Sequence, residues 1–328
     1  MPSRAEASSH RQLRLPSGQV LAWTEYGDPA GAPVLYHHGW PGSRLEARFA
    51  HEPAIGLGLR IIAPDRPGYG ASTQTSIRTL GDWPADAAAL LDHLEISLFA
   101  AVGVSGGAPY ALSCAALLPD RVAHVCVVSA MGPVDGSSAL RDFDPVRRLA
   151  LRLARRRSHF IRGLLQGAVG PLLARHADRF VAALAEGCAP ADRATLARPQ
   201  VQAQIAASFR EGLAASAAGA ARDLELYAAP WEIPLASIKA PVDLWHGEAD
   251  GIVPFPLVQR LADALPTAIP RFLPGEGHYS LPLGHLDRIL GQIVAQWVRA
   301  DSRTCPPPSS ERPGYPLGIA SGPAASRS

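Results

Sequence analysis

The segment 98–109 constrains the fold more than any other part of this 328-residue chain. It places Ser105 in a Gly-x-Ser-x-Gly frame between an apolar run that predicts a strand and one that predicts a helix. A turn this sharp leaves no room for bulky side chains, and Gly103, Gly106 and Gly107 supply that room. We therefore predict a nucleophile elbow, with the N–H of Gly106 facing the position where an oxyanion would form.

The rest of the chain alternates strand and helix patterns. An N-terminal hairpin is predicted at 12–15 and 20–26, and buried strands are predicted at 33–36, 60–63, 99–104, 122–129, 242–245 and 269–273. Helices are predicted at 80–94, 110–118 and 283–298. This alternation predicts an α/β fold, in which a mostly parallel central sheet is flanked by helices on both faces.

The alternation stops in the middle of the chain. An Ala- and Arg-rich stretch with helical spacing, broken by prolines, predicts an inserted helical cap over residues 134–233. The core is then formed by 11–133 and 234–300 together. We expect a flexible N-terminus at 1–10 and a disordered tail at 301–328, because that Pro-, Ser- and Gly-rich tail offers little apolar surface to bury.

Composition excludes several classes of function. The formal net charge of +2 is too small for the basic surface that nucleic-acid binding needs, so we expect no nucleic-acid partner. The cysteines lack the Cys-x-x-Cys spacing of a zinc site or a disulfide framework; they are Cys114, Cys126, Cys188 and Cys305. No phosphate-cradling loop is present, so we expect neither a metal nor a cofactor. Reduced thiols and an N-terminus without an apolar signal stretch predict a cytoplasmic protein.

Two segments raise the question of membrane contact. The uncharged segment 98–118 is long enough to span a bilayer, but Gly103, Gly106 and Pro109 interrupt it, so we predict a strand, a turn and a helix there. Arginines interleaved with apolar residues could form an amphipathic surface helix: Arg147, Arg148, Arg152, Arg155, Arg156 and Arg157. We favour a solvated face of the cap and do not expect membrane contact. The oligomeric state is not predicted.

A serine hydroxyl needs a base, and the base needs a partner that fixes its tautomer. His278 and Asp250 follow the last two predicted strands, and loops after parallel strands gather at one edge of the sheet, so both can meet Ser105. The alternative acid is Asp135, and the alternative bases are His246 and His285, which lack a Gly-flanked loop. We expect three further polar residues to brace loops through hydrogen bonds: His37, His38 and Asp65.

The chain resembles the alpha/beta-hydrolase superfamily, in its serine hydrolase branch, from residue 11 to residue 300. The resemblance rests on the elbow, on His-Gly-Trp-Pro-Gly at 38–42, on Asp-Arg-Pro-Gly-Tyr-Gly at 65–70, and on the loops of Asp250 and His278. It implies an acyl-serine mechanism without a cofactor on a small-molecule ester or amide. It also implies that Trp40 donates its backbone N–H to the oxyanion hole alongside Gly106.

The His-Gly-x-Pro-Gly string is also similar to that of proline iminopeptidases, which have a second glycine where this chain has Trp40. A broad aromatic wall there suits an apolar acyl group better than a charged amino terminus, so we favour carboxylic ester cleavage. An aminopeptidase is the alternative, and it would need a cap carboxylate for the substrate ammonium, with Glu186, Glu211 and Glu225 available. A non-catalytic ligand-binding receptor on the same scaffold is the other alternative. Ser105 argues against relatives that use an aspartate nucleophile.

Overall fold

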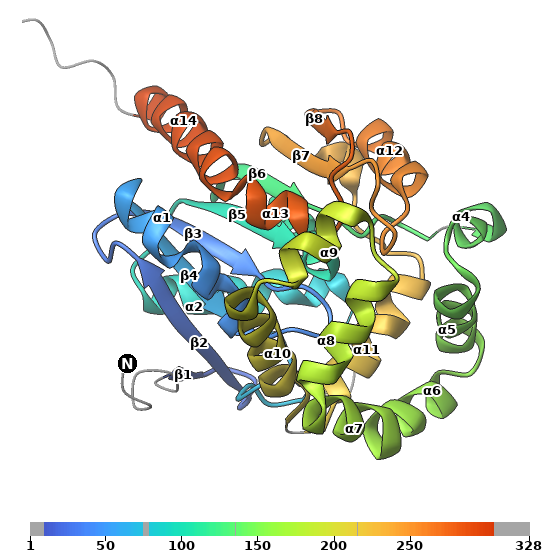
Figure 1. Cartoon of the computed structure of the whole chain (residues 1–328). Helices are drawn as coiled ribbons and strands as arrows, with labels where there is room; N and C mark the ends of the chain where they lie inside the picture. The colour runs from blue at the N-terminus through green and yellow to red at the C-terminus, as the bar shows by residue number, and fades with distance from the viewer. Residues whose placement is uncertain (1–9, 75–78, 135, 215, 305–328) are drawn as a thin grey trace, which may run out of the picture.

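The computed structural model describes residues 10–74, 79–134, 136–214 and 216–304. Within them lies an eight-stranded sheet of order β1-β2-β4-β3-β5-β6-β7-β8 (Figure 1). The strands are β1 (Arg11–Arg14), β2 (Val20–Gly27), β3 (Ala32–His37), β4 (Leu59–Pro64), β5 (Phe99–Val104), β6 (Val122–Val128), β7 (Val242–Gly247) and β8 (Ala268–Leu273). β1 and β2 pair antiparallel to their neighbours, and every pairing from β4 to β8 is parallel. The predicted α/β fold is confirmed.

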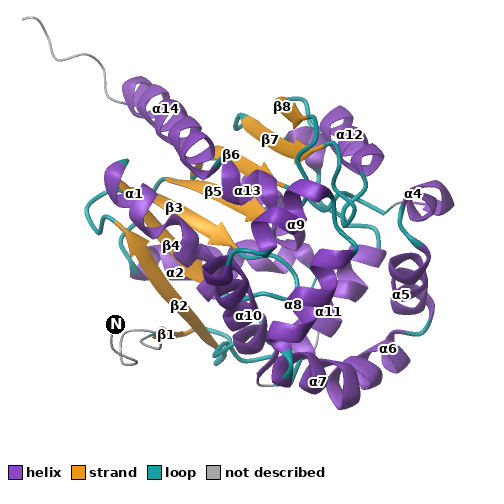
Figure 2. Ribbon diagram, viewed as in Figure 1, coloured by secondary structure: helices purple, strands orange, loops and turns teal. Residues whose placement is uncertain are grey.

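Helices cover both faces of the sheet (Figure 2). Because side chains alternate along a strand, neighbouring residues of β3 enter different cores: Val34 packs in the cluster that includes Ile289 and Ile293, and Leu35 packs in the other. The first cluster is covered by α1 (His51–Gly56) and α14 (Leu286–Thr304), and the second by α2 (Trp83–His93), α3 (Ala108–Leu117) and α12 (Phe255–Ala264). A short helix, α13 (Ser280–Gly284), precedes α14.

A long helical segment separates β6 from β7. It comprises α4 (Gly136–Asp142), α5 (Pro145–Arg156), α6 (Ser158–Leu164), the π-helical turn η4 (Leu165–Val169), α7 (Gly170–Arg175), α8 (Ala177–Glu186), α9 (Pro190–Leu196), α10 (Pro199–Ala214) and α11 (Ala218–Ala228). Figure 1 shows α8, α10 and α11 beyond the arrowheads of β3 and β5, at the carboxyl edge of the parallel strands. In open α/β sheets this edge is where ligands bind.

Two expectations about the ends of helices were wrong. The closing helix begins at Leu286, later than predicted, because α13 ends at Gly284 before it. It continues to Thr304, so the first four residues of the expected tail are helical. The sequence explains the extension, since Pro306 is the first helix-breaking residue after Gly291. The remaining tail and residues 1–9 lie outside the described residues.

α12 was not predicted, although its buried residues Leu257, Val258 and Leu261 follow helical spacing. None of the helices in the described ranges is both long and apolar enough to cross a bilayer.

On α5, the backbone N–H groups of Val146 and Arg147 donate to the Asp144 side chain, while Val146 and Leu149 are exposed. Arg152, Arg155 and Arg156 are exposed as well, so the Arg-rich face of α5 is on the surface.

Candidate active site

Ser105 lies at the tip of the turn η3 (Ser105–Gly107) between β5 and α3, as predicted. Its φ of +52° falls in the left-handed region, which costs a non-glycine residue roughly 1–3 kcal/mol. A hydrogen bond from the loop after β6 stabilises the turn: the Met131 N–H donates to the Ser105 carbonyl at 3.0 Å. The backbone therefore holds the hydroxyl at the tip at the expense of local strain.

The glycines of the elbow are required by close packing. A Cβ placed on Gly103 would lie 2.7 Å from the Cα of Ala108, at the start of α3. A Cβ on Gly107 would collide with the backbone carbonyl of His37, at the end of β3. Any side chain at these two positions would push the helix off the sheet or the turn away from β3.

His278 and Asp250 form a buried pair in the loops after β8 and β7. The Nδ1–H of His278 donates to Oδ2 of Asp250 at 2.7 Å, and both residues are buried. Oδ1 of Asp250 accepts the backbone N–H groups of Ile252 (2.8 Å) and Val253 (2.9 Å), which fix its orientation. This bond leaves Nε2 of His278 free for a second partner.

Electrostatics favour the charged form of each partner. Burial alone would lower the pKa of His278, but the charge and hydrogen bond of Asp250 outweigh it and raise that pKa above its usual value. Burial would likewise raise the pKa of Asp250, yet the charge and hydrogen bond of His278 hold it below its usual value. Asp250 thus stabilises an imidazolium at His278.

In the described structure, the alternative bases do not reach the cavities at Ser105, although Nε2 of His246 lies 3.7 Å from Oδ2 of Asp250. His246 is buried against Phe255 with its Nε2 3.2 Å from the Val253 carbonyl, and burial lowers its pKa. His285 bonds to Glu276. Neither histidine is among the described residues that line the two cavities at Ser105. Asp135 lies outside the described residues.

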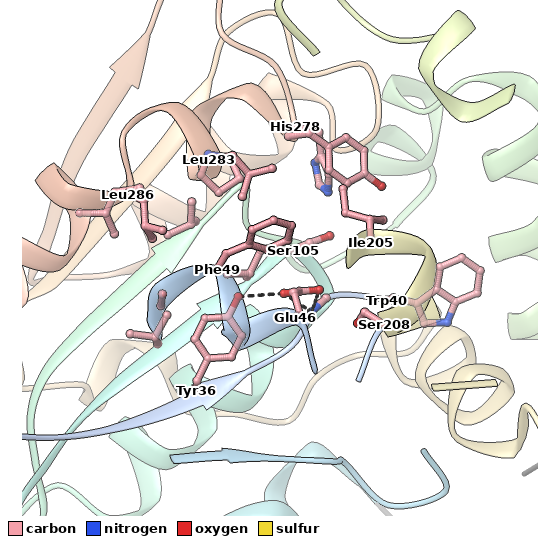
Figure 3. Close-up of a pocket in the computed structure, with 18 of the residues that line it drawn as sticks. Tyr36, Trp40, Glu46, Phe49, Ser105, Ile205, Ser208, His278, Leu283 and Leu286 are labelled. Atoms are coloured by element: carbon pink, nitrogen blue, oxygen red, sulfur yellow. Dashed lines mark hydrogen bonds between the residues drawn. The ribbon is translucent and has the colours of Figure 1, made fainter. Parts of the chain in front are cut away.

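Two cavities meet at Ser105. The smaller has a volume of about 80 Å³ and the larger one of about 520 Å³. Five residues line both: Trp40, Ser105, Phe209, His278 and Tyr279. Figure 3 shows His278 and Ser105 on the wall of the smaller cavity. Apart from a few polar groups, both cavities are lined by aliphatic and aromatic side chains, as is typical of sites for small molecules.

Trp40 and Gly106, the expected oxyanion-hole residues, are neighbours. A Cβ placed on Gly106 would lie 3.0 Å from the Cβ of Trp40 and would collide with the hydroxyl of Tyr227. The Trp40 indole N–H donates to the Ala220 carbonyl on α11 at 2.8 Å. The two backbones therefore lie side by side at the wall of the larger cavity, which both line.

A family model for the alpha/beta hydrolase fold matches residues 32–284, which is more than half of the chain. The chain belongs to the alpha/beta hydrolase fold family. It is 36% identical over 119 residues to a non-heme chloroperoxidase of Streptomyces lividans, covering 36% of this chain and 43% of that protein. It is 31% identical over 144 residues to a probable proline iminopeptidase of Streptomyces coelicolor, covering 41% of this chain and 43% of that protein. The chain thus spans less than half the length of these relatives.

Among solved structures, a thermophilic esterase from Thermogutta terrifontis matches with a TM-score of 0.62 at 22% identity. The match covers 89% of this chain and 98% of that one. At this identity the likeness shows the fold alone. The recognised likeness to the superfamily is confirmed, and a proline iminopeptidase is among its relatives.

This alpha/beta hydrolase ties its helical segment to the site through a buried carboxylate that we did not predict. Asp223 on α11 accepts hydrogen bonds from Arg66 (2.7 Å) and Tyr69 (2.7 Å), both in the loop after β4. Tyr110 on α3 also donates to it. The Asp-Arg-Pro-Gly-Tyr motif was visible in the sequence, but its partner lies 157 residues away without a local signal.

The same cluster reaches the backbone of Gly106 and of the loop that carries Trp40. The Tyr227 hydroxyl lies 2.8 Å from the Gly106 carbonyl and 3.0 Å from Asp223. The Arg66 guanidinium donates to the His38 carbonyl, two residues before Trp40. The cluster therefore fixes both loops relative to α11.

A second carboxylate that we did not predict supports the loop of His278. Asp192 on α9 is fully buried and accepts three consecutive backbone N–H groups, from His278 (2.9 Å), Tyr279 (2.8 Å) and Ser280 (2.8 Å). A Cβ on Gly277 would collide with the same carboxylate. Asp192 thus caps the first turn of α13 from a different part of the chain.

The carboxylates expected to bind a substrate ammonium do not line the site in the described structure. Glu186 is exposed, Glu211 pairs with Arg44 at 2.7 Å, and Glu225 pairs with Arg162 at 2.8 Å. None of the three is among the described residues that line either cavity. An acidic residue that we did not single out, Glu46, does line the smaller one.

His38 and Asp65 bond to the backbone of neighbouring loops, as expected, whereas His37 lies between β5 and α2. His37 Nδ1 lies 2.8 Å from the Val102 carbonyl, and its Nε2 accepts the Trp83 indole N–H at 2.9 Å. Burial lowers the pKa of His37 to about 3, so it is neutral. Asp65 accepts the Arg44 backbone N–H at 2.8 Å. The described residues contain no group of three His, Cys, Asp or Glu side chains arranged to hold a metal ion.

Proposed function

We propose that this alpha/beta hydrolase is a serine hydrolase that cleaves a carboxylic ester or a related acyl bond through an acyl-Ser105 intermediate. One observation carries the proposal: the 2.7 Å bond between His278 and Asp250 fixes the imidazole of a histidine that lines both cavities together with the elbow serine. A base oriented by a carboxylate beside a serine is the arrangement that activates a hydroxyl.

The reaction follows from these positions. Ser105 Oγ attacks the acyl carbon while Nε2 of His278 takes its proton, and the backbone N–H groups of Trp40 and Gly106 stabilise the oxyanion. His278 then gives the proton to the leaving alcohol as the acyl–oxygen bond breaks. Water attacks the acyl-enzyme with His278 again as base, which releases the acid and returns the proton to Ser105. The helical segment 136–228 acts as the cap that walls the larger cavity.

The apolar lining of both cavities favours an ester over a peptide with a charged amino terminus. The three carboxylates proposed for the aminopeptidase alternative lie elsewhere, so that alternative would have to use Glu46 or Asp144. The esterase is a structural neighbour that shows the fold alone and the other protein is a probable proline iminopeptidase, so these names do not select the bond that is cleaved.

Intact-mass measurement after brief treatment with a fluorophosphonate probe tests the proposal without knowledge of the substrate. We expect one adduct on the wild type and on Ser17→Ala, a control at an exposed hairpin serine, and none on Ser105→Ala. Hydrolysis of 4-nitrophenyl esters and of proline 4-nitroanilide then separates an esterase from a peptidase. An unlabelled, folded wild type that binds ligands without turnover would instead identify a receptor.

A further inference from the structure

The smaller cavity contains a carboxyl group for which the proposed mechanism has no role. Glu46 lies on the 3-10 helix η1 (Arg44–Ala50) and lines this cavity together with Ser105 (Figure 3). Protein surrounds the carboxyl, and the surface left to it faces the cavity. The cavity is otherwise mostly apolar, with Phe49 and Ile205 on its wall. A polar group placed in such a lining is what fixes the orientation of a bound molecule.

The two carboxyl oxygens of Glu46 differ in how many hydrogen bonds they accept. Oε1 accepts from the Tyr36 hydroxyl (2.9 Å) and from the Gly39 N–H (3.0 Å). In the part of the chain that the structure describes, Oε2 accepts a hydrogen bond only from the same Gly39 N–H, at 3.1 Å. Among the described residues, no Lys, Arg or His nitrogen forms an ion pair with this carboxyl. A buried carboxylate without a cation is costly, so the group is held more easily with a proton.

The contacts of Glu46 allow a proton on either oxygen, and on Oε1 its partner is the Tyr36 hydroxyl, which can accept as well as donate. Burial raises the pKa of Glu46, although the bonds from Gly39 and Tyr36 and the charges of Arg66 and His278 oppose that effect. The Gly39 N–H can only donate, so it cannot accept a proton carried on Oε2. A proton on Oε2 is thus available to an acceptor in the cavity that Glu46 lines, such as an oxygen of a bound molecule.

The two cavities also differ in how a product could leave. Every residue that lines the smaller cavity is buried or half-buried, whereas Val146 on the rim of the larger one is 77% exposed. A leaving alcohol must depart while the acyl group is still bonded to Ser105. It can do so from the larger cavity, but from the smaller one it would have to pass the acyl group. The acyl chain thus belongs in the smaller cavity.

We infer that the smaller cavity is the acyl subsite and that it selects a short acyl chain carrying an ether, carbonyl or hydroxyl oxygen, which accepts a hydrogen bond from Glu46. The inference rests on the proposed function. A volume of about 80 Å³ corresponds to about five to eight non-hydrogen atoms, at roughly 10–15 Å³ for each water-sized group. The larger cavity takes the leaving group, with wide tolerance of its size.

The test compares two esters of equal size that differ in one atom: 4-nitrophenyl butanoate and 4-nitrophenyl methoxyacetate, in which oxygen replaces a methylene. The kcat/KM ratio of the two esters is measured in the wild type, Glu46→Gln and Glu46→Met. Comparing this ratio between variants cancels the different intrinsic reactivity of the esters. It also cancels any uniform loss caused by a displaced Gly39 loop.

We expect Glu46→Met to lower the ratio of methoxyacetate to butanoate about tenfold, the value of one neutral hydrogen bond. Glu46→Gln should keep the ratio within about threefold, because its amide still donates. The wild-type ratio should fall as pH rises through the pKa of Glu46, while the ratio in Glu46→Gln stays flat. This pH comparison decides the matter even if Glu46→Met does not fold.

Three results would overturn the inference. If the methoxyacetate to butanoate ratio is the same in all variants at all pH values, Glu46 does not bind the acyl chain, and the proposed function is unaffected. Preference for glycine 4-nitroanilide, lost in Glu46→Gln, would show that an ionised Glu46 binds an ammonium group. Absence of ester turnover together with absence of fluorophosphonate labelling would overturn both the inference and the proposed function.

Discussion

The carboxylate of Asp192 accepts the backbone N–H of His278 at 2.9 Å, although 86 residues separate the two along the chain. Its other oxygen accepts the N–H groups of Tyr279 and Ser280. The proposed base is therefore held from two sides, by Asp250 at its ring and by Asp192 at its backbone. One of these supports comes from the core and the other from α9.

Replacing Asp192 with Asn should destabilise the protein by about 1–3 kcal/mol, because an amide has one acceptor oxygen and leaves a buried N–H without a partner. We also expect a lower kcat, since the His278 loop loses its anchor. Thermal unfolding and ester kinetics measure the two effects. Asp178→Asn removes an exposed carboxylate of the same helical segment and should change neither. An Asp192→Asn variant with wild-type stability would contradict the anchoring role.

The pH profile of kcat/KM should fall as pH falls through the pKa of His278, because a protonated imidazole cannot accept the Ser105 proton. Burial lowers that pKa, but Asp250 raises it by more. The midpoint of the pH profile should therefore lie above 6.5. In Asp250→Asn the midpoint should move to lower pH and kcat should drop about 10⁴-fold. Asp263→Asn, at an exposed position on α12, is the control. A profile unchanged by Asp250→Asn would exclude Asp250 as the orienting acid.

The positive φ of Ser105 predicts an unusual stability change. Ser105→Gly should raise the free energy of unfolding by roughly 1 kcal/mol, because glycine adopts this backbone conformation without strain. Ser105→Ala should give no such gain, since alanine carries the same Cβ. Both variants should be inactive. Chemical denaturation compares them, and a Gly variant less stable than the Ala variant would show that the turn is not strained.

The Tyr227 hydroxyl should act on turnover more than on binding. Tyr227→Phe removes the group that bridges the Gly106 carbonyl and Asp223, so the Gly106 N–H is positioned less well. We expect kcat to fall about tenfold with KM nearly unchanged, the pattern of an interaction that matters in the transition state. Tyr26→Phe, in β2 and away from both cavities, serves as the control. A change confined to KM would place Tyr227 in substrate binding instead.

Features that depend on residues close together in the chain could be predicted from the sequence, and those that depend on how distant segments pack could not. The elbow was predictable because Gly103, Ser105 and Gly107 act within one turn. Asp250 and His278 were predictable because each follows a strand, and parallel strands end at one edge. Asp192 and Asp223 gave no signal, because each is a single acidic residue on an ordinary amphipathic helix. Their partners are set by how the helical segment docks, which no local pattern encodes.

The docking of that segment has a consequence for protein engineering. α9 holds the His278 loop through Asp192, and α11 holds the two loops of the proposed oxyanion hole through Asp223 and Tyr227. A chimera that exchanged residues 136–228 for the equivalent helices of a relative would change the substrate pocket and also remove three supports of the reacting groups. Grafts should therefore keep these three side chains and vary only the surfaces facing the larger cavity.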